Sequence, residues 1–291
     1  MTDELNLNVN VNDIIDNNID NKIDNINNSI DEPDELDYLS RLNPHERDSH
    51  ITFKPETHIY TIDGVSNYLS VTSWNHSHFQ HFDSDQIIDN MMKSKNWPKS
   101  KYFGMSREEI KAIWDSSKSS ATGEGTKLHY DIECYYNNCP NKNESIEYSY
   151  FLKFAEDYKN LKPYRTEWVV WNEDVRISGT IDMVFEDENG DLVIYDWKRA
   201  KEISKTSGYN KFAITECISH LPDTNYWHYA LQLNTYKKIL EDKYNKKVVG
   251  MFLVCLHPNN SNKSYQRISI PELREEMEDL FQLRKKNIAS K

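Results

Sequence analysis

The chain is poor in the features that mark secreted, membrane and iron–sulfur proteins. Its 291 residues include only four cysteines, and no two of them form a Cys-X-X-Cys pair. It shows no signal peptide and no apolar run of about 18 residues, the length that a membrane-spanning helix needs. We therefore expect an intracellular, soluble protein without a membrane partner. Its thiols should be reduced, and no iron–sulfur cluster is expected, because such a cluster needs four suitably spaced thiolates. The cysteines are Cys134, Cys139, Cys217 and Cys255.

A basic surplus is also missing. The formal net charge is −12, but residues 1–40 alone hold 11 Asp or Glu and one Lys. The remaining 251 residues therefore carry 36 acidic and 34 basic side chains. A nearly neutral body neither indicates a nucleic-acid partner nor excludes one.

The first residues form a low-complexity segment of Asn, Asp and Ile. Asn and Asp are poor helix formers, and the segment has too few large apolar residues to bury a core. We predict a disordered acidic, Asn-rich tail over residues 1–45, followed by a single domain over residues 46–291.

Helix and strand signals alternate along the rest of the chain, which predicts an α/β fold with a mixed central sheet flanked by helices. In the first half we expect a hairpin that turns at Asp63-Gly64 and a helix after Ser70. A helix over Ser84–Lys95, with Ser84 as its N-cap, should follow. The capping box Ser106–Glu109 should begin a further helix that breaks at Gly123–Thr126, and we expect helices over Lys127–Asn137 and Tyr148–Tyr158. In the second half we expect strands over Thr166–Trp171, Lys247–Leu256 and Tyr265–Ile270, a helix over Asn225–Glu241, and a helix whose first residue is Pro271.

The most informative stretch is a hairpin over Ile177–Lys198. Two β-branched, apolar runs flank Asn189-Gly190, yet they carry Asp182, Asp196 and Lys198. Asp196 and Lys198 point to one face of their strand because side chains alternate. A two-residue loop would put Asp182 on the opposite face. We therefore predict an odd-membered loop with Gly190 in the left-handed conformation, or a bulge, so that Asp182 lies opposite Asp196.

Two carboxylates and a lysine on one face suit Mg²⁺ or Mn²⁺, which prefer oxygen ligands. Lys198 would orient or deprotonate an attacking water, because burial beside a cation lowers the pKa of a lysine. This layout fits phosphodiester hydrolysis. A structural salt bridge of Lys198 with either aspartate is an equally good interpretation of the same three residues.

Other residues could take part in such a site. His129 and Glu133 share a stripe on one helix, and Gln232 and Tyr236 lie one turn apart on another. Glu167 either supports a metal or is an ordinary charge at a sheet edge. A connector over Lys93–Tyr102 interleaves lysines with aromatic residues, which is typical of a strand-binding surface and equally of a solvated loop.

The motifs in this order resemble the PD-(D/E)XK nuclease superfamily, although Ile181 occupies the position of the namesake proline. The flanking sequence is similar to its RecB-like branch, to phage-type exonucleases and to the mitochondrial genome maintenance exonuclease, over roughly Ile51–Leu256. The matching motifs are Ser70-Val-Thr72, Gly125-Thr126-Lys-Leu-His129, Gly179-Thr-Ile-Asp182, Asp196-Trp197-Lys198 and Gln232-Leu-Asn-Thr-Tyr236.

The resemblance implies a restriction-endonuclease-like core and a role for each motif. His129, Asp182 and Asp196 would bind the metal together with the carbonyl of Trp197. Lys198 would be the catalytic lysine, while Gln232 and Tyr236 would position the DNA backbone and the active site. Glu133 and Glu167 would support these groups through hydrogen bonds.

The function implied is a Mg²⁺-dependent deoxyribonuclease, an exonuclease or endonuclease that acts on DNA ends, flaps or single strands in replication, repair or recombination. One alternative is a catalytically inactive DNA-binding or adaptor domain on a nuclease fold. Another is a structural protein whose carboxylates only form salt bridges, in which case metal would not shift the melting temperature.

Overall fold

The computed structural model describes residues 36–54, 57–139, 142–207 and 210–290. Most of the predicted tail lies outside these residues. Within them, Tyr38–Leu42 form helix α2, and Leu39 of this helix is buried. The Leu39 amide donates a hydrogen bond to Asn137 Oδ1 at 3.0 Å. The predicted boundary at residue 46 is therefore too late, because the apolar Leu39 already packs on the body of the protein.

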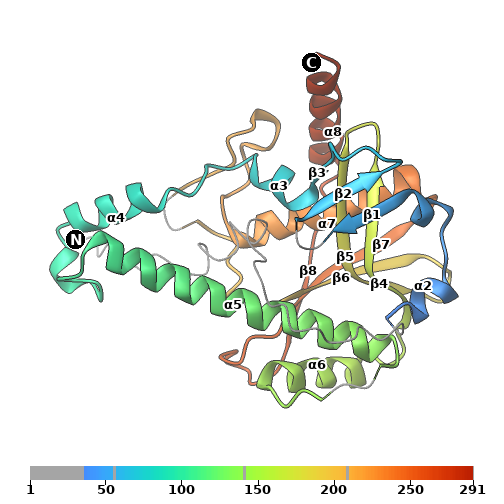
Figure 1. Ribbon diagram of the computed structural model, residues 1–291, viewed down its shortest axis with the longest axis horizontal. Helices are drawn as coiled ribbons and strands as arrows, with labels where there is room; N and C mark the ends of the chain where they lie inside the picture. The colour runs from blue at the N-terminus through green and yellow to red at the C-terminus, as the bar shows by residue number, and fades with distance from the viewer. Residues whose placement is uncertain (1–35, 55–56, 140–141, 208–209, 291) are drawn as a thin grey trace.

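A mixed sheet lies at the centre of the molecule, as the sequence predicted (Figure 1). Strands β4, β5 and β6 form an antiparallel meander, β7 runs parallel to β6, and β8 runs antiparallel to β7. The short strand β3 pairs in parallel with the start of β5, so β5 has β4 along one side and both β3 and β6 along the other. The strands are β3 (Leu69–Ser70), β4 (Lys162–Asn172), β5 (Ile177–Glu186), β6 (Leu192–Lys198), β7 (Val248–Cys255) and β8 (Gln266–Ser269).

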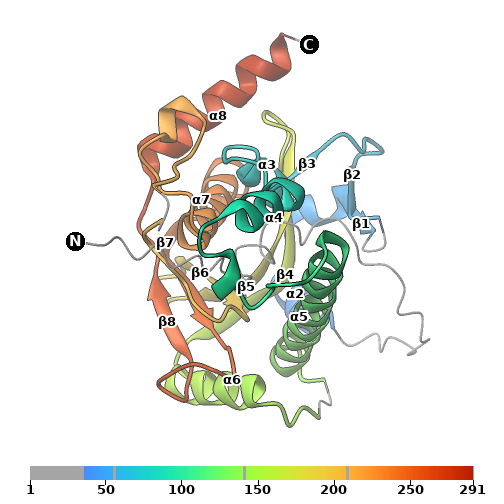
Figure 2. The same cartoon turned by 90° about the vertical axis from the view of Figure 1, so that its left-hand side faces the viewer.

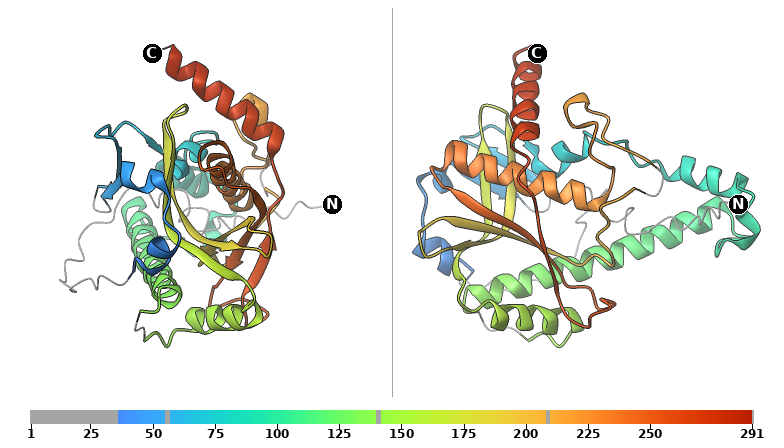
Figure 3. Two further views of the ribbon diagram at one scale, coloured as in Figure 1. Left: turned by 90° about the vertical axis from the view of Figure 1, so that its right-hand side faces the viewer. Right: turned by 180° about the vertical axis from the view of Figure 1, so that it is seen from behind.

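Helices cover both faces of the sheet and bury two separate apolar cores (Figures 1 and 3). Alternation along β6 separates these cores: Ile194 packs in the core with α7, whereas Tyr195 and Trp197 pack in the core with α6. The first core is covered by α3 (Val71–His76), α7 (Asn225–Lys243) and α8 (Arg274–Ala289), and the second by α6 (Ile146–Asp157) and the end of α5 (Arg107–Tyr136).

Helix α5 is one continuous helix of 30 residues, so the predicted break at Gly123–Thr126 does not occur. Each glycine costs a helix about 1 kcal/mol relative to alanine. That cost is overcome because the helix is anchored on both sides of the glycines, by Ile110 and Trp114 before them and by Leu128 and Ile132 after them.

The first half of α5 projects from the body together with α4 (Ser84–Lys93) and the short 3₁₀ helix η3 (Trp97–Lys99) (Figures 1 and 2). We call this projection the arm. Its own small core contains Ile88, Met91, Tyr102, Ile110 and Trp114, with the Trp114 indole N–H donating to the Tyr102 hydroxyl at 2.8 Å. The predicted capping box at the start of α5 is present, but α4 is capped by Asp83 rather than by Ser84.

Two other boundaries differ from the prediction. Strand β1 (Ile51–Lys54) pairs with β2 (Ile59–Ile62), so the hairpin turns before β2. The turn expected at Asp63-Gly64 does form, and Ile62 and Val65 exchange hydrogen bonds of 2.9 and 2.8 Å across it, but it joins only an isolated bridge.

Helix α8 starts at Arg274 instead of Pro271. The amide of Asn234 holds the preceding residues: its Nδ2 donates to the Pro271 carbonyl at 3.0 Å, and its Oδ1 accepts from the Leu273 amide at 2.8 Å. The first helical turn is therefore delayed by three residues. Among the described residues, every helix is too short or too polar to cross a lipid bilayer.

Candidate functional site

The loop between β5 and β6 sets the position of the two aspartates. Met183 lies opposite Tyr195 and Val184 opposite Ile194, and the same register carries Asp182 opposite Asp196. The Asp187 amide donates to the Asp191 carbonyl at 2.8 Å, which closes a three-residue loop whose last residue, Gly190, has a φ of +81°. The predicted odd-membered loop, with Gly190 in the left-handed conformation, is confirmed.

Strands β5 and β6 stop pairing beyond Met183 and Tyr195, and the site lies where they separate. The separation leaves both backbone groups of Trp197 available to side chains. The Trp197 amide donates to Asp182 Oδ2 at 2.9 Å, and the Trp197 carbonyl lies 2.9 Å from His129 Nε2 on α5. These two bonds join α5, β5 and β6 at one point, because unpaired backbone groups in a protein interior need partners.

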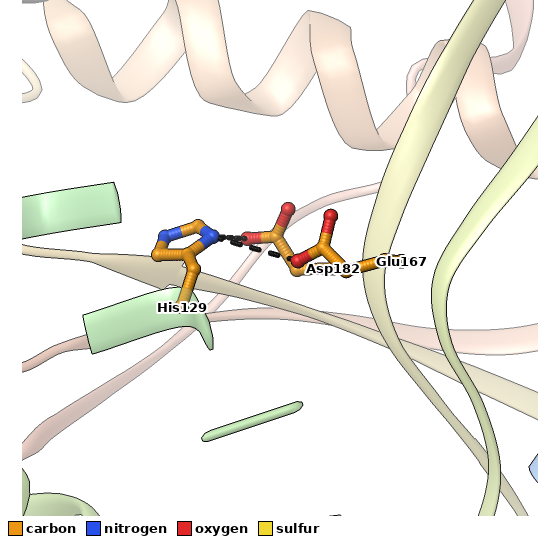
Figure 4. A group of neighbouring side chains, drawn as sticks. All are labelled: His129, Glu167 and Asp182. Atoms are coloured by element: carbon orange, nitrogen blue, oxygen red, sulfur yellow. Dashed lines mark ion pairs between the residues drawn. The ribbon is translucent and has the colours of Figure 1, made fainter. Parts of the chain in front are cut away.

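Three side chains converge beside this point: His129, Glu167 and Asp182 (Figure 4). His129 Nδ1 lies 3.6 Å from Asp182 Oδ2 and 3.8 Å from Glu167 Oε1. One nitrogen and two carboxylate oxygens, one from each residue, all lie within 4.8 Å of one another, a spacing that could hold a metal ion. Glu167 thus belongs to the cluster itself, whereas the sequence could not decide between a supporting group and an edge charge.

The backbone at Glu167 is unusual. Its φ is +41°, a left-handed value that non-glycine residues rarely adopt, in the middle of strand β4. Thr166 and Trp168 on either side keep the regular register with β5, so the distortion is confined to Glu167. Backbone strain of this kind costs about 1–3 kcal/mol and concentrates at functional sites. Nothing in the local sequence signals it.

The cluster is electrostatically poised for a cation. Burial by itself lowers the pKa of His129, but the carboxylates of Asp182 and Glu167 outweigh that effect and raise the pKa to about 9. Burial and the neighbouring Glu167 raise the pKa of Asp182 against the opposing effect of His129. A proton on His129 therefore supplies the positive charge that these carboxylates need when no metal is present.

Asp196 and Lys198 lie next to this cluster as a buried ion pair. Lys198 Nζ is 2.9 Å from Asp196 Oδ2 and 4.6 Å from the centre of the Tyr229 ring. Burial raises the pKa of Asp196 to about 6 even though Lys198 opposes the shift. The salt bridge that the sequence offered as an alternative is therefore present for Asp196, beside the three-residue cluster.

Gln232 and Tyr236 face the same region from α7. Gln232 Nε2 lies 3.5 Å from the Tyr236 hydroxyl. A Cβ atom at Gly179 would come within 2.9 Å of Val71 and 3.0 Å of the Tyr236 ring, so the close approach of α3 and α7 to β5 requires glycine there. Two further residues near the site were not predicted from the sequence. Tyr229 packs against Lys198, and the hydroxyl of Tyr60 lies 3.2 Å from Thr180 Oγ1. The position of Tyr229, one turn before Gln232 on the same face of the helix, was the sequence feature that could have indicated its place beside the site.

A cavity of about 500 Å³ opens on the Glu167 side of the cluster. Its lining includes Glu133 and Glu167 together with Asp48 and Arg165, which form an ion pair at 2.7 Å. Glu133 therefore lies near Glu167 but outside the three-residue cluster.

The donor set fits a hard divalent cation. One imidazole nitrogen and two carboxylate oxygens are within reach of one another, and no thiolate belongs to the cluster. Mg²⁺ and Mn²⁺ favour such oxygen-rich sets. His129, Glu167 and Asp182 are the groups that could hold the ion. The Trp197 carbonyl contacts the other ring nitrogen of His129, Nε2, and Asp196 lies one strand away.

A family model described as the PD-(D/E)XK nuclease superfamily matches residues 95–290, about two thirds of the chain, which includes every residue of the cluster. No curated protein matches. Among solved structures, the one titled "Crystal structure of SSO0001" is similar to this chain, with 14% sequence identity, 77% of each chain covered and a TM-score of 0.34.

Proposed function

Since the chain belongs to the PD-(D/E)XK nuclease superfamily, we propose that it is a metal-dependent deoxyribonuclease that hydrolyses phosphodiester bonds. The observation that carries the proposal is the convergence of His129, Asp182 and the Trp197 backbone where β5 and β6 separate, with Lys198 beside them. A structural salt bridge alone would not require a histidine from α5 at that point.

The proposed ligands are His129, Asp182, Asp196 and the Trp197 carbonyl, with Glu167 added by its position in the cluster. When bound, Mg²⁺ or Mn²⁺ supplies positive charge that offsets the charge growing on a scissile phosphate. Asp182 Oδ2 already accepts the Trp197 amide, so its orientation is set before any metal binds.

Lys198 is the proposed catalytic residue for the attacking water. Its ammonium group is held between Asp196 and the ring of Tyr229, so it is restricted to one side of the site. From there it would orient the water and stabilise charge on the phosphate, or accept a proton when its own pKa falls beside a bound cation. Gln232, half-buried on α7, would donate to the phosphate backbone, and the buried Tyr236 would keep α7 against Gly179.

The finer assignment rests on sequence resemblance. The motif order from Gly125-Thr126 to Gln232–Tyr236 is similar to RecB-like and mitochondrial genome maintenance exonucleases. On that basis we propose an exonuclease that acts on DNA ends, flaps or single strands in repair or recombination.

The test is cleavage of end-labelled single-strand, duplex and flap DNA by the purified protein with Mg²⁺, Mn²⁺ or EDTA. We expect cleavage with either metal and none with EDTA. Lys198→Ala and Asp182→Asn should each reduce the rate by at least about 100-fold, because each removes a group that acts on the transition state.

Lys162→Ala is the matched control, since Lys162 is exposed and pairs only with Glu186 at the far end of β5. Full activity of Lys198→Ala would reject the assignment. Metal-independent DNA binding without cleavage would instead support the adaptor alternative.

A further inference from the structure

The end of the arm carries an unusual concentration of positive charge. Residues 93–105 contain four lysines and no acidic residue, although the folded part of the chain is nearly neutral. All four lysine side chains are exposed, and so is Phe103, at 57% of its surface. We call Lys93, Lys95, Lys99, Lys101 and Phe103 the lysine tip.

The carboxylates of Asp85 and Asp89 on α4 do not neutralise the tip. Asp85 pairs with Arg107 at 3.3 Å and with Lys111 at 2.8 Å, and Asp89 pairs with Arg107. The carboxylates of α4 are thus engaged on α5, on the flank of the arm.

The tip has a defined shape. Tyr102 is buried in the arm core and bonded to Trp114, so its neighbour Phe103 is held outward. The chain reverses there through Gly104, whose φ is +86°, and the Met105 amide donates to the Tyr102 carbonyl at 3.0 Å. Lys101 Nζ lies 4.8 Å from the centre of the Tyr102 ring.

From these observations we propose that the lysine tip is a second nucleic-acid contact, which binds the phosphates and one unpaired base of a single strand whose other end lies in the active site. Lysines match phosphates by charge, and an exposed aromatic ring stacks on any unpaired base. A paired base offers no such face. The inference rests on the proposed function in one respect, namely that the other end of the strand lies in the active site.

Helix α5 sets the distance between the two contacts. Arg107 lies at the tip end and His129 in the site, 22 residues apart in a continuous helix. At 1.5 Å per residue the separation is about 33 Å. A single strand stacked with the 3.4 Å rise of a duplex strand needs roughly ten nucleotides to span it, and a fully extended strand needs about half as many.

The test measures binding of labelled single strands of 4 and 20 nucleotides to the full chain in EDTA, where no cleavage is expected. Phe103→Ala should weaken binding of the 20-mer by roughly 5- to 100-fold. The double variant Lys99→Ala/Lys101→Ala should make the slope of log K against log [salt] shallower by about 1.4, or 0.7 per lost phosphate contact. The 4-mer is too short to reach both contacts even when extended, so the ratio of its affinities for wild type and the tip variants should be much closer to one.

Lys159→Ala/Lys286→Ala removes the same charge from two exposed positions outside the arm and is the matched control. Melting curves and near-ultraviolet circular dichroism check that the arm core around Trp114 stays folded. Unchanged 20-mer binding by both tip variants would overturn the inference, as would an equal loss by the control variant or on blunt duplex DNA. The binding assay needs no catalysis. Unchanged binding by the tip variants would therefore not contradict the proposed nuclease activity, and a protein that does not cleave DNA could still be tested for binding at the tip.

Discussion

Asp182 has two partners at one of its carboxylate oxygens. Its Oδ2 accepts the Trp197 amide at 2.9 Å and lies 3.6 Å from His129 Nδ1. A carboxylate that is already desolvated and oriented loses little further freedom when it binds a cation. At the scale of single residues, the site is therefore assembled before any ligand arrives.

Glu167 provides a direct test of the cluster. Glu167→Gln keeps the size of the side chain but removes one of the two carboxylates that face His129. We expect Mn²⁺ affinity, measured by calorimetry, to fall about 10- to 100-fold. The pKa of His129, followed by NMR, should also fall, because Glu167 helps to raise it. Glu188→Gln in the exposed β5–β6 loop is the control, and unchanged affinity in Glu167→Gln would exclude Glu167 from the metal site.

His78 gives a pH prediction away from the site. Burial lowers its pKa from 6.5 to about 4, and Arg284 adds to the shift. The folded protein then binds fewer protons than the unfolded chain between these values, so stability is complete above pH 6.5 and falls as the pH drops towards 4. The loss should be on the order of 3 kcal/mol.

Urea denaturation of wild type and His78→Gln at pH 7.5 and 4.5 measures this difference. The variant should lose the His78 share of the pH dependence, whereas His220→Gln, at an exposed position, should keep it. Equal pH dependence in wild type and His78→Gln would contradict the assignment.

Two glycines show how α5 and β5 differ in their tolerance of an added side chain. A Cβ at Gly123, in the projecting half of α5, would meet nothing within 4 Å, whereas one at Gly179 on β5 would contact Val71 and Tyr236 at 2.9–3.0 Å. The same substitution should therefore have opposite effects.

Gly123→Ala should stabilise α5 by about 1 kcal/mol, and Gly179→Ala should destabilise the protein by about 1–3 kcal/mol. Hydrogen exchange of the α5 amides reads the first effect locally, and chemical denaturation reads the second. Faster exchange in Gly123→Ala would show that the glycine is needed for the observed backbone.

How far the sequence could predict these elements depends on the range of the interactions that form them. The hairpin register followed from side-chain alternation together with the requirement that Asp182 share a face with Asp196, whereas a two-residue turn at Asn189-Gly190 would have put Asp182 on the opposite face. The continuity of α5 did not, because it depends on two cores that lie far apart in the sequence. The left-handed backbone at Glu167 depends on surroundings in three dimensions and leaves no sequence pattern.

On the scale of the whole molecule, charge is separated in space. The site gathers carboxylates and is half-buried, and the lysine tip gathers ammonium groups and is exposed. The carboxylates of the site repel DNA, and on our proposal the tip supplies attraction elsewhere. A protein whose residues 41–291 are nearly neutral would in this way bind a polyanion without a basic surface overall.

The continuity of α5 also connects the lysine tip to the candidate site through one helix. The lysine tip directly precedes the first residue of α5, and His129 lies on the same continuous helix, next to residues that pack on the sheet. If a strand bound at the tip pulled on the arm, the displacement would pass along α5 to the imidazole of His129, which faces Asp182 and Glu167. The alignment of the site would then depend on the mechanical load along the strand as well as on occupancy.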